Sequence, residues 1–256
     1  MGRLGKVVAL LGGMFMGLSP ANAAPELAPA RLFLVGDSTM ADKPNLAYPE
    51  RGWGQLLPGF MAPELTIINL ATNGRSTKSF RDEGRWQAML DQLQQGDYVL
   101  VQFGHNDQKK KDPSRYAAAE SDYQINLTHF IHDVQEKGGI PMLASSICRR
   151  SFSEEGVLEH NLSEYAQAAK KVAAETKVSF FDLQQRTCDR FEALGVEDTK
   201  PLFLQVPAGL FEKYPDGKVD NTHLSTVGAT MVAQFFVREL MAKQHPLARY
   251  IMQQQL

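Results

Sequence analysis

The sequence is poor in cysteine and has no excess of basic residues, and each shortage argues against a class of protein. Only Cys148 and Cys188 occur among 256 residues, which is too few for a disulfide-rich scaffold. Lysine and arginine number 27 against 29 acidic residues, a balance that argues against a nucleic-acid-binding domain. The hydrophobic content of 43% is that of an ordinary globular protein, and one domain is expected at this length.

After the first 23 residues, the sequence also lacks any apolar run that could cross a membrane. In the first 23, Arg3 and Lys6 precede an uncharged apolar segment at residues 7–18, and residues 21–23 (Ala-Asn-Ala) form a small-x-small cleavage site. This order predicts a secretory signal peptide. A membrane anchor is the disfavoured alternative, because the apolar segment is shorter than the roughly 20 residues that a spanning helix needs. We expect residues 24–256 to be one exported domain, periplasmic or extracellular, with a net charge of −4.

The sequence does not decide whether the two cysteines form a disulfide. An exported protein meets an oxidising compartment, where a disulfide between Cys148 and Cys188 can form. The sequence does not establish that their Cα atoms come within bonding range. A bridge and two separate buried thiols therefore remain alternatives.

Short apolar runs alternate with longer amphipathic stretches along the chain. The apolar runs predict strands at residues 31–35, 65–70, 98–103, 140–145 and 178–182. The amphipathic stretches predict helices at residues 85–93, 122–136, 163–175 and 226–243, with Ser163 as an N-cap. This alternation predicts a three-layer α/β fold with a mostly parallel, five-stranded sheet. The proline- and glycine-containing segment 201–220 is expected to be a long functional loop.

Four polar segments lie where an open α/β sheet binds its ligands, beyond the carboxyl ends of the strands. Three of them follow expected strands, at residues 36–39 (GDST), 69–76 (NLATNGRS) and 104–107 (GHND). The fourth, residues 220–223 (DNTH), comes shortly before the last helix. Packing alone does not explain four such segments.

Two of these segments together hold the residue types of a serine hydrolase. Ser38 follows Gly36, which allows a sharp turn, but a serine hydroxyl is a weak nucleophile and needs an adjacent base. His223 can supply that base, and Asp220, three residues earlier, can fix its tautomer. Capping of a helix by Ser38 and a simple turn at Asp220 are the structural alternatives.

The other two segments hold candidate hydrogen-bond donors. Acyl transfer builds negative charge on a carbonyl oxygen, and preorganised N–H groups stabilise that charge. The Gly74 backbone N–H and the Asn106 side-chain amide are suitable, with the Ser38 N–H as a third donor. Alternatively, Gly74 only permits a turn and Asn106 only braces a loop.

Taken together, GDS at residues 36–38, Gly74 after Asn73, GHND at 104–107 and DxxH at 220–223 resemble the four blocks of the SGNH hydrolases, or GDSL-type esterases. The resemblance extends over nearly all of residues 24–256. It implies a three-layer, flavodoxin-like fold, no metal and no organic cofactor. By resemblance, Ser38 is the nucleophile, His223 the base and Asp220 its partner, while Ser38, Gly74 and Asn106 form the oxyanion hole.

Longer matches indicate one branch of this family. GDSTMA at residues 36–41, RGWGQ at 51–55, NGRSTKSF at 73–80 and FGHNDQ at 103–108 look like the rhamnogalacturonan acetylesterase branch. This implies removal of acetyl groups from a pectin backbone, with xylan or another acetylated glycan as the alternative substrate. Arg75 and Lys78 are candidates for binding an anionic polysaccharide, and Trp53 for stacking on a sugar ring. Solvated loop charge and a core tryptophan are the alternatives.

Two other functions remain to be tested. One is a metal-dependent hydrolase that uses Asp37, Asp107, Asp220 and His223 as ligands. The other is a glycan-binding module that kept the cleft without its chemistry. The chain contains no GxSxG, Walker, HExxH or GxGxxG motif. The oligomeric state is open.

Overall fold

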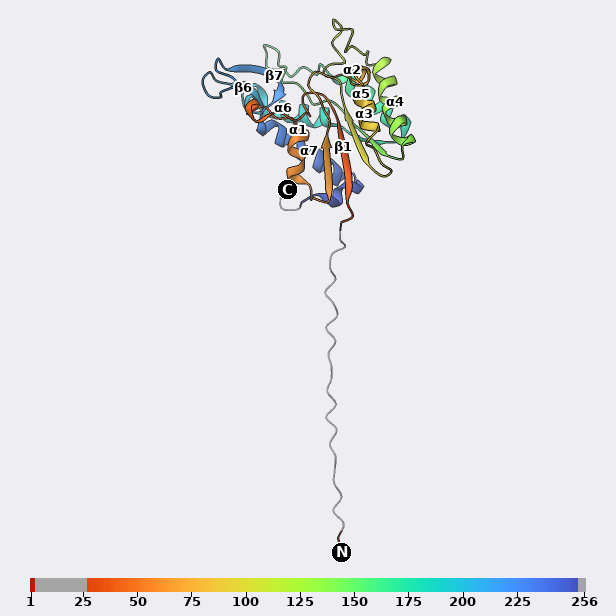
Figure 1. Ribbon diagram of the computed structural model, residues 1–256. Coiled ribbons are helices and arrows are strands. Elements are labelled where there is room, and N and C mark those ends of the chain that lie inside the picture. The colour runs from red at the N-terminus through yellow and green to blue at the C-terminus, as the bar shows by residue number, and fades with distance from the viewer. Residues whose placement is uncertain (3–26, 253–256) are drawn as a thin grey trace.

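A five-stranded parallel sheet forms the centre of the molecule (Figure 1). The computed structural model describes residues 1–2 and 27–252. The sheet order is β2-β1-β3-β4-β5, and the strands are β1 (Ala30–Gly36), β2 (Leu65–Asn69), β3 (Tyr98–Gln102), β4 (Ile140–Ala144) and β5 (Ser179–Phe181). All five predicted strands are confirmed, and no strand end differs from its predicted position by more than one residue. The predicted parallel, flavodoxin-like order is confirmed as well.

The strand order determines where a ligand site can lie. From β1 the chain crosses to β2 on one side, and from β2 it returns to β3 on the other side of β1. This reversal makes the carboxyl ends of β1 and β3 a topological switch point. Gly36 at the end of β1 pairs in register with Gln102 at the end of β3. The segments that follow these two strands therefore leave the sheet side by side.

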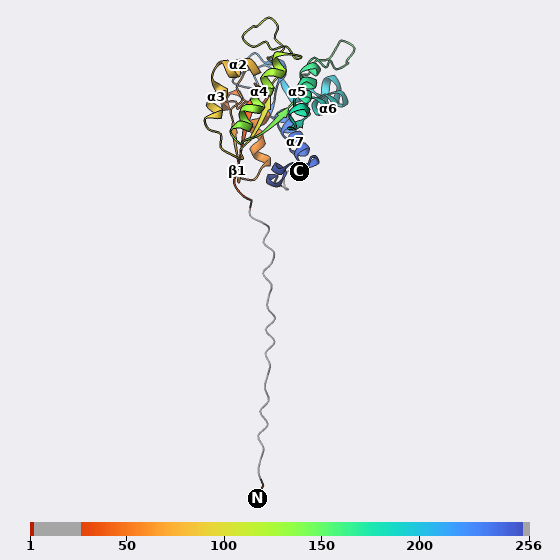
Figure 2. The ribbon, with the colours of Figure 1, turned by 90° about the vertical axis from the view of Figure 1, so that its right-hand side faces the viewer.

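Helices cover both faces of the sheet (Figures 1 and 2). One face is covered by α1 (Trp53–Leu56), α6 (Leu183–Asp198) and α7 (Thr226–Ala242), and the other by α2 (Thr77–Asp82), α3 (Arg85–Leu90), α4 (Asp122–Glu136) and α5 (Ser163–Thr176). Short 3-10 turns complete the described elements at η1 (Asn45–Ala47), η2 (Leu57–Phe60), η3 (Lys200–Leu202) and η4 (Pro246–Tyr250).

Two separate apolar cores result from the two-residue period of a strand. On β1, Leu32 and Leu34 pack against α1 and α7, whereas Phe33 and Val35 pack against α2, α3 and α4. All four side chains are fully buried. This explains why the sheet strands appear in the sequence as continuous apolar runs.

The predicted helices exist, but some of their details differ. The bounds of α4 are as predicted, and α3, α5 and α7 end within a few residues of the expected positions. The assignment of Ser163 as an N-cap is wrong, because Leu162 occupies that position and makes no side-chain cap. Helix α6 was not predicted. Asp182, which we expected to end a strand, caps this helix by accepting a hydrogen bond from the Gln185 N–H at 3.1 Å.

The segment 201–220 is not the long loop that its prolines and glycines predicted. Strand β6 (Phe203–Val206) pairs antiparallel with β7 (Lys218–Leu224), and only the connection between them is irregular. The hairpin extends beyond one side of the sheet, at the upper left of Figure 1. Prolines and glycines in the connection concealed two short strands whose pairing depends on contact between distant residues.

A disulfide joins Cys148, in the segment after β4, to Cys188 on α6. Their Cα atoms lie 5.2 Å apart, within the normal range for a bridge. The bridge therefore ties the segment after β4 to the helix on one face of the sheet. Of the two alternatives that the sequence left open, the structure contains the disulfide.

The predicted signal peptide lies almost entirely outside the described residues, in segment 3–26. Among the residues that are described, no helix is both long and apolar enough to cross a membrane.

We expect the disulfide to stabilise the fold substantially. It closes a loop across 40 residues of sequence, and a constraint of this length on the unfolded chain contributes about 4 kcal/mol. A Cys148→Ser/Cys188→Ser variant should lose roughly that free energy of unfolding in urea titrations. Equal unfolding curves for this variant and the oxidised wild type would contradict the prediction.

Candidate active site

Ser38 lies on a tight turn at the end of β1. The N–H groups of Met40 and Ala41 both donate to the Asp37 carbonyl, at 3.2 and 3.1 Å. A Cβ on Gly36 would lie 2.7 Å from the Gln102 carbonyl oxygen, so only glycine fits before this turn. Residues 38–41 form a turn and not the start of a helix, so the capping alternative for Ser38 is wrong. The turn directs the Ser38 side chain into a cleft.

His223 and Asp220 lie on β7, at an irregularity in its pairing with β6. Phe203 pairs with Leu224, but the next residue, Leu204, pairs with Asp220. Residues 221–223 therefore have no partner on β6 and form a bulge, a feature that re-aims side chains near active sites. The sequence locates residues 220–223 only shortly before the last helix, and the structure places them on this bulged strand.

The bulge brings three side chains into a hydrogen-bonded line. His223 Nε2 lies 3.0 Å from Ser38 Oγ, and His223 Nδ1 lies 2.8 Å from Asp220 Oδ2. The other carboxylate oxygen, Asp220 Oδ1, accepts from the backbone N–H groups of Thr222 at 2.9 Å and His223 at 3.0 Å. Ser38 and His223 are 185 positions apart in the sequence, and the fold brings them together.

The charge state of Asp220 determines the tautomer of His223. Partial burial alone would raise the pKa of Asp220, but the hydrogen bonds from the imidazole and backbone N–H of His223, and that from Thr222, outweigh burial and hold its pKa far below the ordinary value. An ionised carboxylate can only accept, so Nδ1 carries the proton. Nε2 is then free to accept the Ser38 hydroxyl proton. This arrangement can activate a serine for nucleophilic attack.

Gly74 and Asn106 lie on the opposite side of Ser38 and also line the cleft. Gly74 has a left-handed backbone conformation, with φ of 75°, that favours glycine. Asn106 donates through Nδ2 to the Arg75 carbonyl at 2.9 Å, while its Oδ1 accepts from Lys109 Nζ at 2.8 Å. The second Nδ2 hydrogen remains available. Within residues 27–252, the backbone N–H groups of Ser38 and Gly74 donate no hydrogen bond, so both remain available as donors.

Lys43 is a buried lysine that was not predicted from the sequence to belong to the site. It links the segment before Gly74 to the hairpin that carries His223. The Lys43 side chain is 2% exposed, forms an ion pair with Glu50 at 3.1 Å and donates to Asn73 Oδ1. Glu50 also accepts from the Tyr214 hydroxyl at 3.2 Å. Burial lowers the pKa of Lys43, although the carboxylate of Glu50 opposes this. The chain of contacts connects the segment before Gly74 to the hairpin that carries His223.

A second histidine–aspartate pair lies beneath the site. His105 Nδ1 is 3.2 Å from Asp37 Oδ2, and the other oxygen of Asp37 accepts from the N–H and the hydroxyl of Thr39. Both side chains are buried, and burial lowers the pKa of His105 so that its neutral ring donates to the Asp37 carboxylate. His105 therefore braces the segment before Ser38.

Asp107 connects the two segments that supply the donors. Its Oδ1 accepts from the N–H of Thr77 at 2.9 Å and from the Thr77 hydroxyl at 2.5 Å. Thr77 begins α2, directly after the segment of Gly74, while Asp107 follows Asn106. Burial raises the pKa of Asp107 to about 7, although the hydrogen bonds from Thr77 act in the opposite direction.

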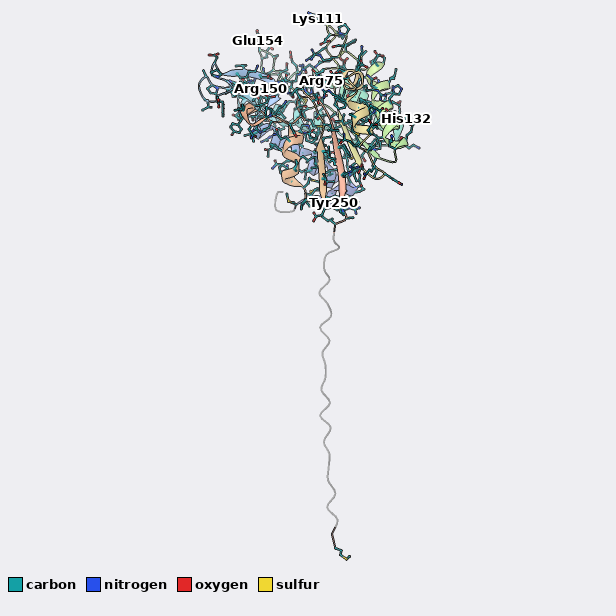
Figure 3. All side chains as sticks on the ribbon, viewed as in Figure 1. Arg75, Lys111, His132, Arg150, Glu154 and Tyr250 are labelled. Atoms are coloured by element: carbon teal, nitrogen blue, oxygen red, sulfur yellow. A yellow bond between two sulfur atoms is a disulfide. The ribbon has the colours of Figure 1, made fainter. Side chains whose placement is uncertain are left out.

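The cleft that contains Ser38 has a volume of about 670 Å³. Its lining residues are Ser38, Glu50, Asn73, Gly74, His105, Asn106, Lys109, Arg149, Leu204, Lys213, Tyr214, Lys218, Asp220, Thr222 and His223. Arg75 and Arg150 line two pockets that share residues with the cleft, and both lie at the end of the molecule opposite Tyr250 (Figure 3).

The three predicted substrate contacts lie outside this cleft. Trp53 is fully buried and donates to Gln102 Oε1 at 2.7 Å, so the prediction that it stacks on a sugar is wrong and the core alternative holds. Lys78 donates to the Pro113 carbonyl at 2.7 Å. Arg75 lines a neighbouring pocket that shares Gly74 with the cleft, and it is paired with Glu83 at 2.9 Å.

The ligand set of the metal-dependent alternative does not come together. Asp37 pairs with His105, Asp107 with Thr77, and Asp220 with His223. Across residues 27–252, no group of three or more histidine, cysteine, aspartate or glutamate side chains is arranged to hold a metal ion.

The fold and the site define a serine-hydrolase type of α/β protein, and comparison with known proteins identifies the family. Residues 34–231 match the model of the GDSL-like Lipase/Acylhydrolase family. The chain therefore belongs to this family, and it is a carboxylic ester hydrolase.

Similar proteins agree in fold and in class. The chain is 43% identical to rhamnogalacturonan acetylesterase RhgT of Bacillus subtilis, over 80% of this chain and 87% of that protein. It is 29% identical to a rhamnogalacturonan acetylesterase of Emericella nidulans, over 86% and 89%. The solved structure of YxiM from Bacillus subtilis superposes with a TM-score of 0.72 at 25% identity, covering 86% of this chain and 58% of that one. The acetylxylan esterase Axe2 of Geobacillus stearothermophilus shares the fold at a TM-score of 0.59 and 18% identity, over 83% and 94%.

We expect Asp107 to make stability depend on pH. An unfolded aspartate titrates near a pKa of about 3.9, whereas Asp107 in the fold titrates at about 7. Between these values the folded state binds more protons, so the free energy of unfolding falls as the pH rises, by about 4 kcal/mol in all. Urea unfolding from pH 5 to 8 should show this decline, and Asp107→Asn should remove most of it.

Asp82→Asn is the matched control, because it removes one negative charge from an exposed position on α2. The free energy of unfolding of this variant should keep the wild-type dependence on pH. An unchanged slope in Asp107→Asn would show that Asp107 does not titrate in this range.

Proposed function

We propose that Ser38, His223 and Asp220 carry out ester hydrolysis. The observation that carries this proposal is the line of hydrogen bonds from Ser38 Oγ through His223 to Asp220. Ser38 Oγ forms a bond to the acetyl carbonyl carbon while its proton passes to His223 Nε2. Asp220 holds the tautomer and stabilises the imidazolium that forms.

The negative charge of the tetrahedral intermediate falls on the former carbonyl oxygen. The N–H groups of Ser38 and Gly74 and the Asn106 amide are the proposed donors to it. Lys109 and the Arg75 carbonyl fix the Asn106 amide, so this donor needs no reorientation during the reaction. Preorganised donors of this kind contribute a few kcal/mol each to lowering the barrier.

Collapse of the intermediate completes the cycle. The bond between the carbonyl carbon and the sugar oxygen breaks, and the sugar oxygen takes the proton from His223. The acetyl group remains on Ser38. Water then attacks this ester with His223 again as base, acetate leaves, and the proton returns to Ser38 Oγ.

We expect Asp220→Asn to lower kcat by roughly 10³- to 10⁴-fold, because an amide can stabilise the wrong tautomer of His223. Hydrolysis of p-nitrophenyl acetate measures the loss. Asp216→Asn removes an exposed charge from the same hairpin and should retain wild-type kcat, with both variants checked by thermal unfolding. Wild-type kcat in Asp220→Asn would refute the assigned role.

The substrate that we propose is acetylated rhamnogalacturonan. Three relatives with this activity in their names, one of them as a probable activity, are 43%, 32% and 29% identical to the chain over at least 80% of its length. Acetylated xylan is the alternative within the class, since acetylxylan esterases share the fold. The non-catalytic binding module is disfavoured because Ser38, His223 and Asp220 are in hydrogen-bonding geometry.

The proposed site of action is outside the cytoplasm. The basic start, the apolar segment at residues 7–18 and the small-x-small motif support export. The disulfide between Cys148 and Cys188 supports an oxidising destination, because such bonds persist in the periplasm and outside the cell.

Acetate release by residues 24–256 from acetylated rhamnogalacturonan, homogalacturonan and xylan tests the proposal. We expect the highest kcat/KM on rhamnogalacturonan and no release by Ser38→Ala, whose thermal unfolding should match the wild type. Equal release from all three polymers would discard the substrate assignment and keep the esterase. Undiminished release by Ser38→Ala, or failure of a fluorophosphonate to label Ser38, would discard the mechanism.

A further inference from the structure

The cleft around Ser38 is positively charged although the whole chain is negative. The chain has a net charge of −2, but four cations line the cleft, namely Lys109, Arg149, Lys213 and Lys218. The cleft also contains two carboxylates, and both are already engaged: Glu50 pairs with Lys43, and Asp220 with His223. The excess of positive charge is therefore local and has no counterpart in the composition of the chain.

None of these four cations forms an ion pair with a carboxylate within residues 27–252. The ion pairs there involve other cations, such as Arg75 with Glu83 and Arg81 with Asp133. Lys109 has a role of its own, since it supports the Asn106 amide. Arg149, Lys213 and Lys218 therefore line the cleft without an ion-pair partner among residues 27–252.

Arg149 is the most constrained of the three. It is half-buried between the cleft and an adjoining pocket, and it lines both. One guanidinium nitrogen donates to the His105 carbonyl at 3.3 Å, which holds the side chain beside the segment of Asn106. Burial lowers the pKa of Arg149, although the carboxylates of Asp37 and Asp220 oppose this from beyond ion-pair distance. An anionic ligand would relieve that cost, and a guanidinium suits a carboxylate because it can donate two parallel hydrogen bonds.

Lys213 and Lys218 approach from the hairpin on the other side. Lys213 lies in the connection between β6 and β7, near the ring of Tyr214, and Lys218 begins β7. Both side chains are exposed and reach the cleft. Since β7 also carries Asp220 and His223, a ligand held by these lysines is held next to the reacting groups.

We propose that Arg149, Lys213 and Lys218 form a carboxylate-binding subsite that directs the esterase to acetyl groups on uronate residues. The subsite rests on the proposed function and deepens it by naming the chemical group that is recognised. It binds a uronate carboxylate while the acetyl group of the same or the adjacent sugar lies against Ser38. The predicted contacts Arg75 and Lys78 are not part of it, because each is engaged outside the cleft.

Carboxyl reduction of the substrate provides the first test. Acetylated rhamnogalacturonan, with its uronates intact, is compared with the same polymer after reduction of the carboxyl groups to alcohols and re-acetylation to equal acetate content. The native polymer should have a KM at least several-fold lower at low salt. This preference should shrink as the salt concentration rises, because exposed charges are screened within about 10 Å at 0.1 M.

Charge-removing variants provide the second test. Lys213→Gln and Lys218→Gln should each raise KM for the native polymer by up to roughly fivefold, as expected for exposed ion pairs. Arg149→Gln should raise it by about 10- to 100-fold, as expected for hydrogen bonds to a charged group. For all three, kcat on p-nitrophenyl acetate and KM for the reduced polymer should stay near wild type. The matched control is Lys110→Gln/Lys111→Gln, which removes two exposed charges from the same end of the molecule but outside the cleft lining (Figure 3).

Three results would overturn the inference. Equal KM for the native and reduced polymers would show that no carboxylate is recognised, while the proposed substrate would stand. A loss of preference in the Lys110/Lys111 control equal to that in Lys213→Gln/Lys218→Gln would show that general charge is responsible. Absence of acetate release from both polymers, with p-nitrophenyl acetate still cleaved, would overturn the proposed substrate and the subsite with it.

Discussion

The Asp220 carboxylate is the group on which the geometry of the site depends. It accepts two backbone N–H groups with one oxygen and the imidazole of His223 with the other. The backbone bonds hold the bulge of β7 in place, and the imidazole bond sets the tautomer and direction of the ring. One ionised side chain therefore holds both the local backbone and the imidazole, and its low pKa follows from the same hydrogen bonds.

Other polar side chains at this end of the sheet hold separate segments together. Asp107 joins the segment of Asn106 to α2, and Lys43 joins the segment of Gly74 to Glu50. The two histidine–aspartate pairs have different roles because they differ in burial. The pair of His105 is sealed from solvent and braces the turn, whereas His223, about one third exposed, faces the cleft where a substrate can enter.

Much of the fold was predictable because its elements are locally encoded. The five strands of the sheet are apolar runs between turn residues, and α4 shows a clear helical period that ends at Gly138. The hairpin of β6 and β7 was not predictable in this way. Its strands are short, and their pairing depends on contacts between positions that only the folded chain brings together. Ser163 is not the cap of α5, because it is the first residue inside the helix and Leu162 occupies the N-cap position.

The sequence by itself determined the family and the residue types of the site. Ser38, Gly74, Asn106, Asp220 and His223 occur in short motifs whose chemistry is recognisable without a structure. The charges that face the cleft became apparent only in the folded chain. Trp53 lies in the core, Lys43 is buried beside Glu50, and Arg149 reaches the cleft from a distant segment. The reason is physical: a motif depends on neighbours along the chain, whereas burial and electrostatic environment depend on neighbours in space.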